Sequence, residues 1–201
     1  MKLIGMLDSP YVRRVAISAK CLGIDLEHES VSVFRHFEQF QQINPVVKAP
    51  SLILDDGVVL MDSTLILDYL ETSSGKSLVP SDLKQRAHAL RLIGLSLAAC
   101  EKAVQLYYER NLRPADIQYQ PWVERVEGQL AAAFTALEKE LEHSDLPVDG
   151  SLAQTGISLA VAWSFTNLVV PDQVDSSRYA RIAEYTAYAE GTDAFISTPM
   201  T

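Results

Sequence analysis

Cysteine is scarce in this chain: Cys21 and Cys100 are the only two among 201 residues. They lie far apart and outside any C-x-x-C spacing, which excludes a disulfide framework and a cysteine-rich zinc site. The four histidines also lack metal-ligand spacing, so we expect no metal. Few thiols suit a reducing compartment, and the N-terminus lacks the basic stretch and apolar run of a signal peptide. We therefore expect a cytoplasmic protein.

Basic residues are few relative to acidic ones. The chain has 17 Lys and Arg against 26 Asp and Glu, a formal net charge of −9. Such an excess repels phosphate backbones and anionic lipids. The one long apolar segment, residues 151–170, carries Gln154, Ser158 and Asn167, which favours a buried helix of a helical bundle over a membrane span. We therefore expect neither a nucleic-acid partner nor a membrane partner.

Short apolar runs alternate with helical patterns over the first 80 residues. The apolar runs predict strands, and the Asp56-Gly57 turn predicts a hairpin between the last two of them, at 3–7, 26–33, 51–54 and 58–60. Apolar residues at helical spacing predict helices at 10–22, 37–43 and from Asp62-Ser63 to about residue 74. The sum is an α/β domain, βαβαββα with a mixed sheet, over residues 1–78.

After Pro80 every strong pattern is helical. Ser81 is the expected cap of a helix of roughly 30 residues that ends near Pro114. Further helices are expected from Pro121 to residue 141, over 151–170 and over 179–189. The sequence therefore predicts a second, all-helical domain at residues 81–201, and the fold class is α/β plus all-α.

Two segments of the first domain are candidates for ligand binding. Ser9-Pro10 places a hydroxyl at a helix N-terminus beside the carboxyl edge of the sheet, although a plain helix cap would explain the same pair. Pro50 directly precedes a strand. If its peptide bond were cis, Ala49 would present its backbone N–H and C=O to a peptide-like ligand. A trans proline that ends a loop is the open alternative.

A third candidate is Asp62-Ser63, which opens the helix after the hairpin. The free N–H groups and the positive end of the helix dipole attract a carboxylate there. The Ser63 hydroxyl can add a donor, and the Asp62 carboxylate could meet an ammonium group. Capping alone is the competing explanation for this pair.

These segments together resemble one family. The stretches Ser9-Pro10-Tyr11-Val12-Arg13-Arg14, Asn44-Pro45 to Lys48-Ala49-Pro50, and Met61-Asp62-Ser63 are similar in order and spacing to the glutathione transferases. The likeness covers essentially the whole chain, and the serine is similar to that of the serine-type, bacterial-like cytosolic members. It implies a thioredoxin-like N-terminal domain, a cis Pro50, glutathione as co-substrate and a homodimer.

The resemblance also implies roles for individual residues. Ser9 would donate a hydrogen bond to the glutathione sulfur, and the backbone of Ala49, next to Pro50, would pair with the cysteinyl unit. Asp62 and Ser63 would hold the γ-glutamyl end, and Arg35 and Lys48 would contact the glycyl carboxylate. Tyr107 and Tyr108 would contribute to the electrophile pocket. For the two tyrosines, packing in an aromatic core is an equally open explanation.

The resemblance implies conjugation of the glutathione thiolate to a small hydrophobic electrophile, as in detoxification. Glutathione-dependent reduction of peroxides or disulfides, and a non-enzymatic role in protein contacts, are the alternatives. The chain departs from the family at its central helix, where Ala153 and Gly156 replace a Ser/Thr and an Asp that form a capping box. Ser151 and Gln154 fit S-x-x-Q, so we expect a shifted box with Ser151 as the cap.

Overall fold

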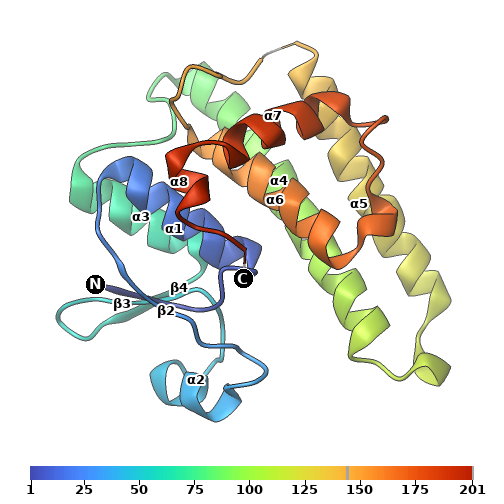
Figure 1. The fold of residues 1–201 in the computed structure, drawn as a ribbon, viewed down its shortest axis with the longest axis horizontal. Coiled ribbons are helices and arrows are strands. Elements are labelled where there is room, and N and C mark those ends of the chain that lie inside the picture. The colour runs from blue at the N-terminus through green and yellow to red at the C-terminus, as the bar shows by residue number, and fades with distance from the viewer. Residues whose placement is uncertain (144, 201) are drawn as a thin grey trace. The chain divides into compact units, whose positions relative to one another are not determined.

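The computed structural model describes residues 1–143 and 145–200. They divide into two compact units, one of Met1–Leu78 with Gly191–Thr201 and one of Val79–Glu190 (Figure 1). Residues 191–201 thus cluster with the first unit, whereas the sequence pattern assigns them to the helical part.

A four-stranded mixed sheet forms the centre of the first unit. Its strands are β1 (Lys2–Ile4), β2 (Glu27–Glu29), β3 (Ser51–Ile53) and β4 (Val59–Met61), in the order β2-β1-β3-β4. β1 and β2 are parallel, and β3 is antiparallel to both of its neighbours. The strands are shorter than the apolar runs that predict them; β1 ends because Gly5 turns the chain with a φ of +136°. The expected thioredoxin-like arrangement is confirmed.

Three helices cover the two faces of this sheet. They are α1 (Pro10–Leu22), α2 (Phe37–Ile43) and α3 (Ser63–Ser74). Leu3 and Ile4 point to opposite faces because side chains alternate along a strand. Leu3 belongs to the apolar core shared with α1 and α3, which lie side by side, and Ile4 packs with Phe40 of α2 (Figure 1).

The C-terminal segment returns to α1. In it a short helix, α8 (Asp193–Ile196), places the buried Phe195 ring 5.1 Å from the guanidinium carbon of Arg13. The Nε of Arg13 donates to the carbonyl oxygen of Thr198 at 2.9 Å. Arg13 is only 2% exposed, and a buried guanidinium without such partners would be costly. These contacts explain why the last residues cluster with the first unit.

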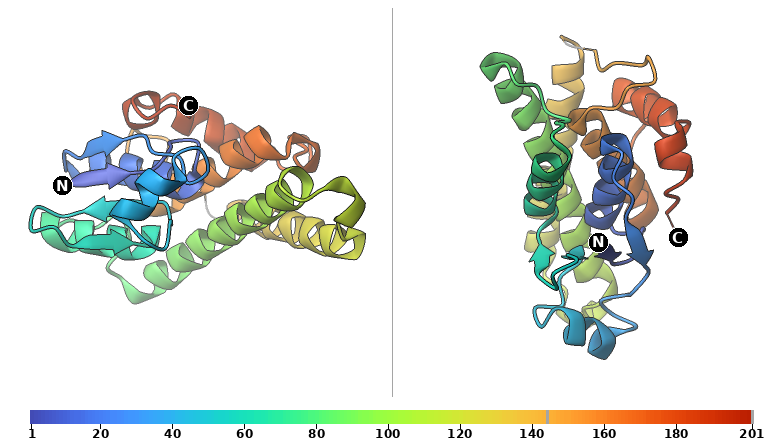
Figure 2. Two further views of the ribbon diagram at one scale, coloured as in Figure 1. Left: turned by 90° about the horizontal axis from the view of Figure 1, so that it is seen from below. Right: turned by 90° about the vertical axis from the view of Figure 1, so that its left-hand side faces the viewer.

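The second unit consists mainly of four helices, α4 (Leu83–Asn111), α5 (Gln120–Leu141), α6 (Gln154–Val169) and α7 (Ala180–Glu190). Two single-turn 3₁₀ helices, η1 (Ala115–Ile117) and η2 (Pro171–Gln173), connect them. α4 packs along α5 and α6, and α6 packs along α7 (Figure 2). The expected Ser81 cap is wrong: Asp82 caps α4, and its carboxylate accepts a hydrogen bond from the backbone N–H of Gln85 at 2.9 Å.

The central position expected for α6 is confirmed. Most of its residues are buried, and the Trp163 ring packs edge-on against Phe134, with 5.2 Å between ring centroids. Tyr179 completes this aromatic cluster at 6.0 Å from Trp163. Among the described helices, none is both long and apolar enough to cross a membrane.

The start of α6 differs from the sequence-based expectation. Ala153 is the N-cap residue, so the predicted cap at Ser151 is wrong. The Ser151 hydroxyl donates instead to the carboxylate of Asp149 at 2.6 Å, which keeps it in the preceding turn. Gly156 stands where an aspartate was expected from the resemblance. The Tyr185 ring of α7 occupies the space that a side chain at position 156 would need, because a Cβ added to Gly156 would meet this ring. The absent side chain therefore leaves room for a tyrosine.

Candidate functional site

The segments with the candidate binding residues leave the sheet along one edge. The strand register forms a row across the sheet made of Glu29, Ile4, Ser51 and Met61. The loop after β1, the segment before β3 and the segment after β4 all lie just beyond this row (Figure 1). The sheet therefore brings Ser9, Ala49–Pro50 and Asp62–Ser63 to the carboxyl edge of β1, where α/β sheets bind ligands.

Ser9 is the N-cap residue of α1 and is partly buried. Its backbone is fixed, because its N–H donates to Met6 at 3.1 Å and its carbonyl accepts from Arg13 at 2.9 Å. Pro10 occupies the first helical position. Within the described residues the Ser9 side chain makes no capping hydrogen bond. Its hydroxyl can therefore donate to a ligand at the positive end of the α1 dipole.

Hydrogen bonds and a close contact with the loop after β1 fix the Ala49–Pro50 segment. The peptide bond between these two residues is cis. The buried Asn44 side chain donates to the Ser51 hydroxyl at 2.9 Å, and that hydroxyl donates to the Lys48 carbonyl at 2.8 Å. Gly5 allows the loop after β1 to approach, since a Cβ there would lie 3.2 Å from the Cβ of Ala49. The loop that leads from β1 towards Ser9 thus passes directly beside Ala49.

Asp62 and Ser63 form the start of α3. Asp62 has a φ of +65°, which is uncommon for a residue other than glycine, and its carboxylate accepts from the N–H of Thr64 at 2.8 Å. Ser63 is buried, and its hydroxyl accepts a hydrogen bond from the Arg14 guanidinium of α1 at 3.1 Å. The third candidate segment is therefore tied to the helix that begins at Ser9.

Arg35 and Lys48, the two cations expected to meet a glycyl carboxylate, are both exposed. Arg35 lies in the segment after β2, and Lys48 lies in the segment before β3. Arg35 lies beside the loop after β1, with its Nη2 3.9 Å from the Met6 sulfur. It also acts on Asp8: burial raises the pKa of the Asp8 carboxyl, and hydrogen bonding to Ser9 and the charge of Arg35 partly oppose this. Lys48 directly precedes Ala49.

The second unit contains a cavity of about 450 Å³ at the turn from α4 to α5. Tyr108 lines it, whereas Tyr107 is not among its lining residues, although the two ring centroids are 6.3 Å apart. Burial, and secondarily the neighbouring Tyr107, raises the pKa of the Tyr108 phenol, so this hydroxyl is a donor at neutral pH. The other lining residues were not predicted from the sequence; they are Gln105, Glu109, Leu112, Arg113, Pro114, Ile117 and Trp122.

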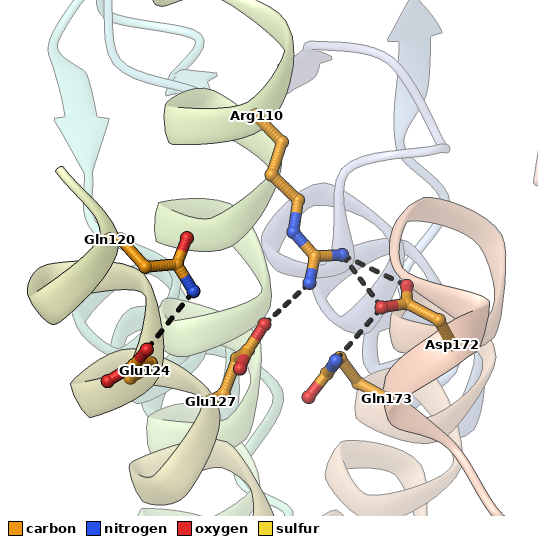
Figure 3. Close-up of polar contacts among 6 residues, drawn as sticks. All are labelled: Arg110, Gln120, Glu124, Glu127, Asp172 and Gln173. Carbon is orange, nitrogen blue, oxygen red and sulfur yellow. Dashed lines mark hydrogen bonds and ion pairs between the residues drawn. The ribbon is translucent and has the colours of Figure 1, made fainter. Parts of the chain in front are cut away.

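A charged network fixes the end of α4 beside this cavity (Figure 3). The guanidinium of Arg110 donates to Glu127 of α5 at 2.6 Å and to both carboxylate oxygens of Asp172 in η2 at 3.0 Å. Nη1 makes both contacts with Asp172 and Nη2 makes the contact with Glu127, so the guanidinium bridges two carboxylates through charge-assisted hydrogen bonds. The network therefore positions the last turn of α4 relative to α5 and η2.

Comparison with known proteins identifies the fold of the first unit. Residues 3–77 match the family model described as the glutathione S-transferase N-terminal domain. The first unit is therefore a glutathione S-transferase N-terminal domain. Among curated relatives, the chain is 26% identical over 187 residues to the uncharacterized GST-like protein YibF of Escherichia coli K12, with 92% of each chain covered.

Solved structures of glutathione transferases extend the likeness over the whole chain. A glutathione S-transferase of Methylobacillus flagellatus with glutathione bound is 25% identical, covers 100% of this chain and 99% of its own, and gives a TM-score of 0.89. A family member of Pseudomonas fluorescens with bound glutathione is also 25% identical, with 100% and 98% covered and a TM-score of 0.84. The described part of the chain shows no cluster of three or more metal-ligating side chains.

Proposed function

We propose that this protein is an enzyme that binds glutathione at the sheet edge of its first unit and adds the thiolate to a small hydrophobic electrophile. The observation that carries the proposal is the Ser9 hydroxyl, which lies at the N-terminus of α1 and is not used to cap that helix in the described structure. The glutathione-bound relatives support the choice of tripeptide.

The chemical task of such a site is to keep the glutathione sulfur ionised. A free thiol has a pKa of about 8.5, so only a few per cent is thiolate at neutral pH. A hydrogen bond to a charged group contributes about 1.5–3 kcal/mol, and one pKa unit corresponds to about 1.4 kcal/mol. The Ser9 hydroxyl alone can therefore lower the thiol pKa by about one to two units. The α1 dipole acts in the same direction.

The rest of the tripeptide is assigned along the same edge. The backbone of Ala49, ahead of the cis bond to Pro50, pairs with the cysteinyl unit, as one extended strand pairs with another. Asp62 receives the γ-glutamyl ammonium, and Ser63 donates to the γ-glutamyl carboxylate. The exposed cations Arg35 and Lys48 attract the glycyl carboxylate.

The electrophile is assigned to the second unit. The cavity at the α4–α5 turn is of the size that small-molecule sites have, and it joins apolar side chains to the Tyr108 hydroxyl. The Tyr107 ring neighbours that of Tyr108, with 6.3 Å between the centroids, and does not line the cavity. Trp122 also lines this cavity, so quenching of its fluorescence by an apolar electrophile is a direct readout.

A homodimer in the cytoplasm is part of the proposal. Several large apolar side chains of the first unit are exposed on β4, on the turn before it and on α3: Val58, Val59, Met61, Leu65 and Tyr69. Exposed apolar side chains on β4 and α3 are candidates for a protein interface. A second copy of the chain would cover them, and sedimentation velocity would show the dimer. In the described residues neither cysteine forms a disulfide, as suits a reducing compartment.

The experiment is a conjugation assay with a generic aromatic electrophile, comparing wild type with Ser9→Ala. We expect kcat/KM at pH 7 to fall about 10- to 100-fold, with partial recovery at higher pH, because the thiol pKa rises by one to two units. Ser73→Ala, a substitution near the end of α3, is the matched control and should retain full activity. Equal rates for wild type and Ser9→Ala would remove Ser9 from its role.

Two outcomes would redirect the proposal. Peroxide or disulfide turnover without conjugation would favour a reductase that uses the same glutathione site. Failure of the wild-type protein to be retained on immobilised glutathione would favour a non-enzymatic role in protein contacts.

A further inference from the structure

Arg14 connects the two helices whose N-termini form the glutathione site. It lies on α1, is 2% exposed, and its Nη1 donates to the Ser63 hydroxyl at 3.1 Å and to the Thr64 hydroxyl at 3.3 Å. Both acceptors belong to the first turn of α3. A planar guanidinium can reach two adjacent hydroxyls from one fixed position, which a lysine ammonium does less well.

The direction of this hydrogen bond determines what Ser63 can do. A guanidinium only donates, so the Ser63 oxygen must be the acceptor in the contact with Arg14. The hydroxyl proton of Ser63 then remains for a different acceptor. A donor that already accepts from a charged group is polarised, which strengthens its own outgoing hydrogen bond. Ser63 is therefore prepared to donate to an anion.

The charge of Arg14 selects for the same anion. The guanidinium is buried and lies within hydrogen-bond distance of the Ser63 hydroxyl, so solvent and salt screen its charge less than they would at the surface. A carboxylate bound at Ser63 is attracted by this charge, whereas a neutral amide in the same place is not. The N-terminal dipole of α3 adds to the attraction.

We propose that Arg14 is a positioning residue that acts through Ser63 to select the carboxylate of the γ-glutamyl group. The inference rests on the proposed function, which places that group at Asp62 and Ser63. It predicts a specific ligand preference: glutathione binds more tightly than its analogue in which the γ-glutamyl α-carboxylate is converted to an amide. The rest of the two ligands is identical.

The test compares the Kd of both ligands by calorimetry for wild type and Arg14→Gln. We expect wild type to prefer glutathione over the amide by about tenfold or more, the range of one charge-assisted hydrogen bond. Arg14→Gln should raise the Kd for glutathione about tenfold and leave that for the amide within about twofold. In the conjugation assay the KM for glutathione should rise, while kcat at saturating glutathione is retained.

Arg13→Gln is the matched control. Arg13 is the adjacent residue of α1 and is equally buried, but its contacts are with Thr198 and Phe195. Its substitution should lower stability without changing the ratio of the two Kd values. A purely structural Arg14 would behave in the same way. Arg14→Lys, combined with Ser63→Ala, supplies a second test, because the lysine variant should add no further loss once the serine hydroxyl is removed.

Each result decides the inference. Equal affinity of the wild-type protein for glutathione and the amide would overturn it, whether or not any Arg14 variant folds. Equal weakening of both ligands by Arg14→Gln would also overturn it and would leave the glutathione site itself intact. If wild type binds neither ligand at millimolar concentration, the proposed function fails first.

Discussion

Replacement of Gly156 by alanine tests the packing at the start of α6. The added Cβ would lie 2.6 Å from Cζ and 2.9 Å from Cε1 of Tyr185, and closer still to the hydroxyl oxygen. The tyrosine is 6% exposed, so its ring has little room to move away. Overpacking of this kind costs about 1–3 kcal/mol, while Gly→Ala inside a helix gains about 1 kcal/mol. We expect a net loss of up to about 2 kcal/mol.

Gly128→Ala is the control, since Gly128 lies inside α5 and no described atom lies within 4 Å of its added Cβ. This variant should gain up to about 1 kcal/mol from helix propensity alone. Urea denaturation followed by circular dichroism measures both variants, and a Tyr185→Phe background should reduce the cost of Gly156→Ala. If Gly156→Ala stabilises the protein as much as Gly128→Ala does, the packing argument is wrong.

Two further predictions concern charged groups. Burial raises the pKa of Asp8, so the ionised form destabilises the folded state; Asp8→Asn should raise Tm at pH 7, and the gain should vanish below about pH 4, where the unfolded carboxyl is also protonated. An Asp8→Asn gain that persists at pH 3 would contradict this. Arg110→Ala removes the contacts with Glu127 and Asp172 and should cost about 1 kcal/mol in low salt and less in 1 M salt. Arg125→Ala, on the surface of α5, should cost less, and a salt-independent loss at Arg110 would argue against an electrostatic cause.

Local signals in the sequence were sufficient for the helices of the first unit. α1 begins at Pro10, whose fixed φ suits the first helical turn, and ends at Gly23, whose φ of +77° suits a C-cap. The βαβαββα pattern predicted a mixed sheet, but neither the strand order nor the register could be read locally. The convergence of Ser9, Pro50 and Asp62 at one edge is a consequence of that register.

Features that depend on packing between distant residues were missed. The Ser151 hydroxyl could bond either to the N-terminus of α6 or to Asp149, and in the structure it bonds to Asp149. Arg14 follows Arg13 in a helical pattern, and two adjacent cations give no local sign that both are buried. The cavity residues Ile117 and Trp122 come from elements on either side of a turn, so only the folded unit shows them together.

The return of the C-terminal segment to α1 has a consequence for biosynthesis. The second unit is an insertion between residues 78 and 191 of the first, so a fragment that stops at residue 78 would leave the Arg13 guanidinium without the Thr198 carbonyl. During translation the first unit can be completed only after residues 191–200 have been synthesised. The helical insertion can therefore fold while the first unit is still incomplete.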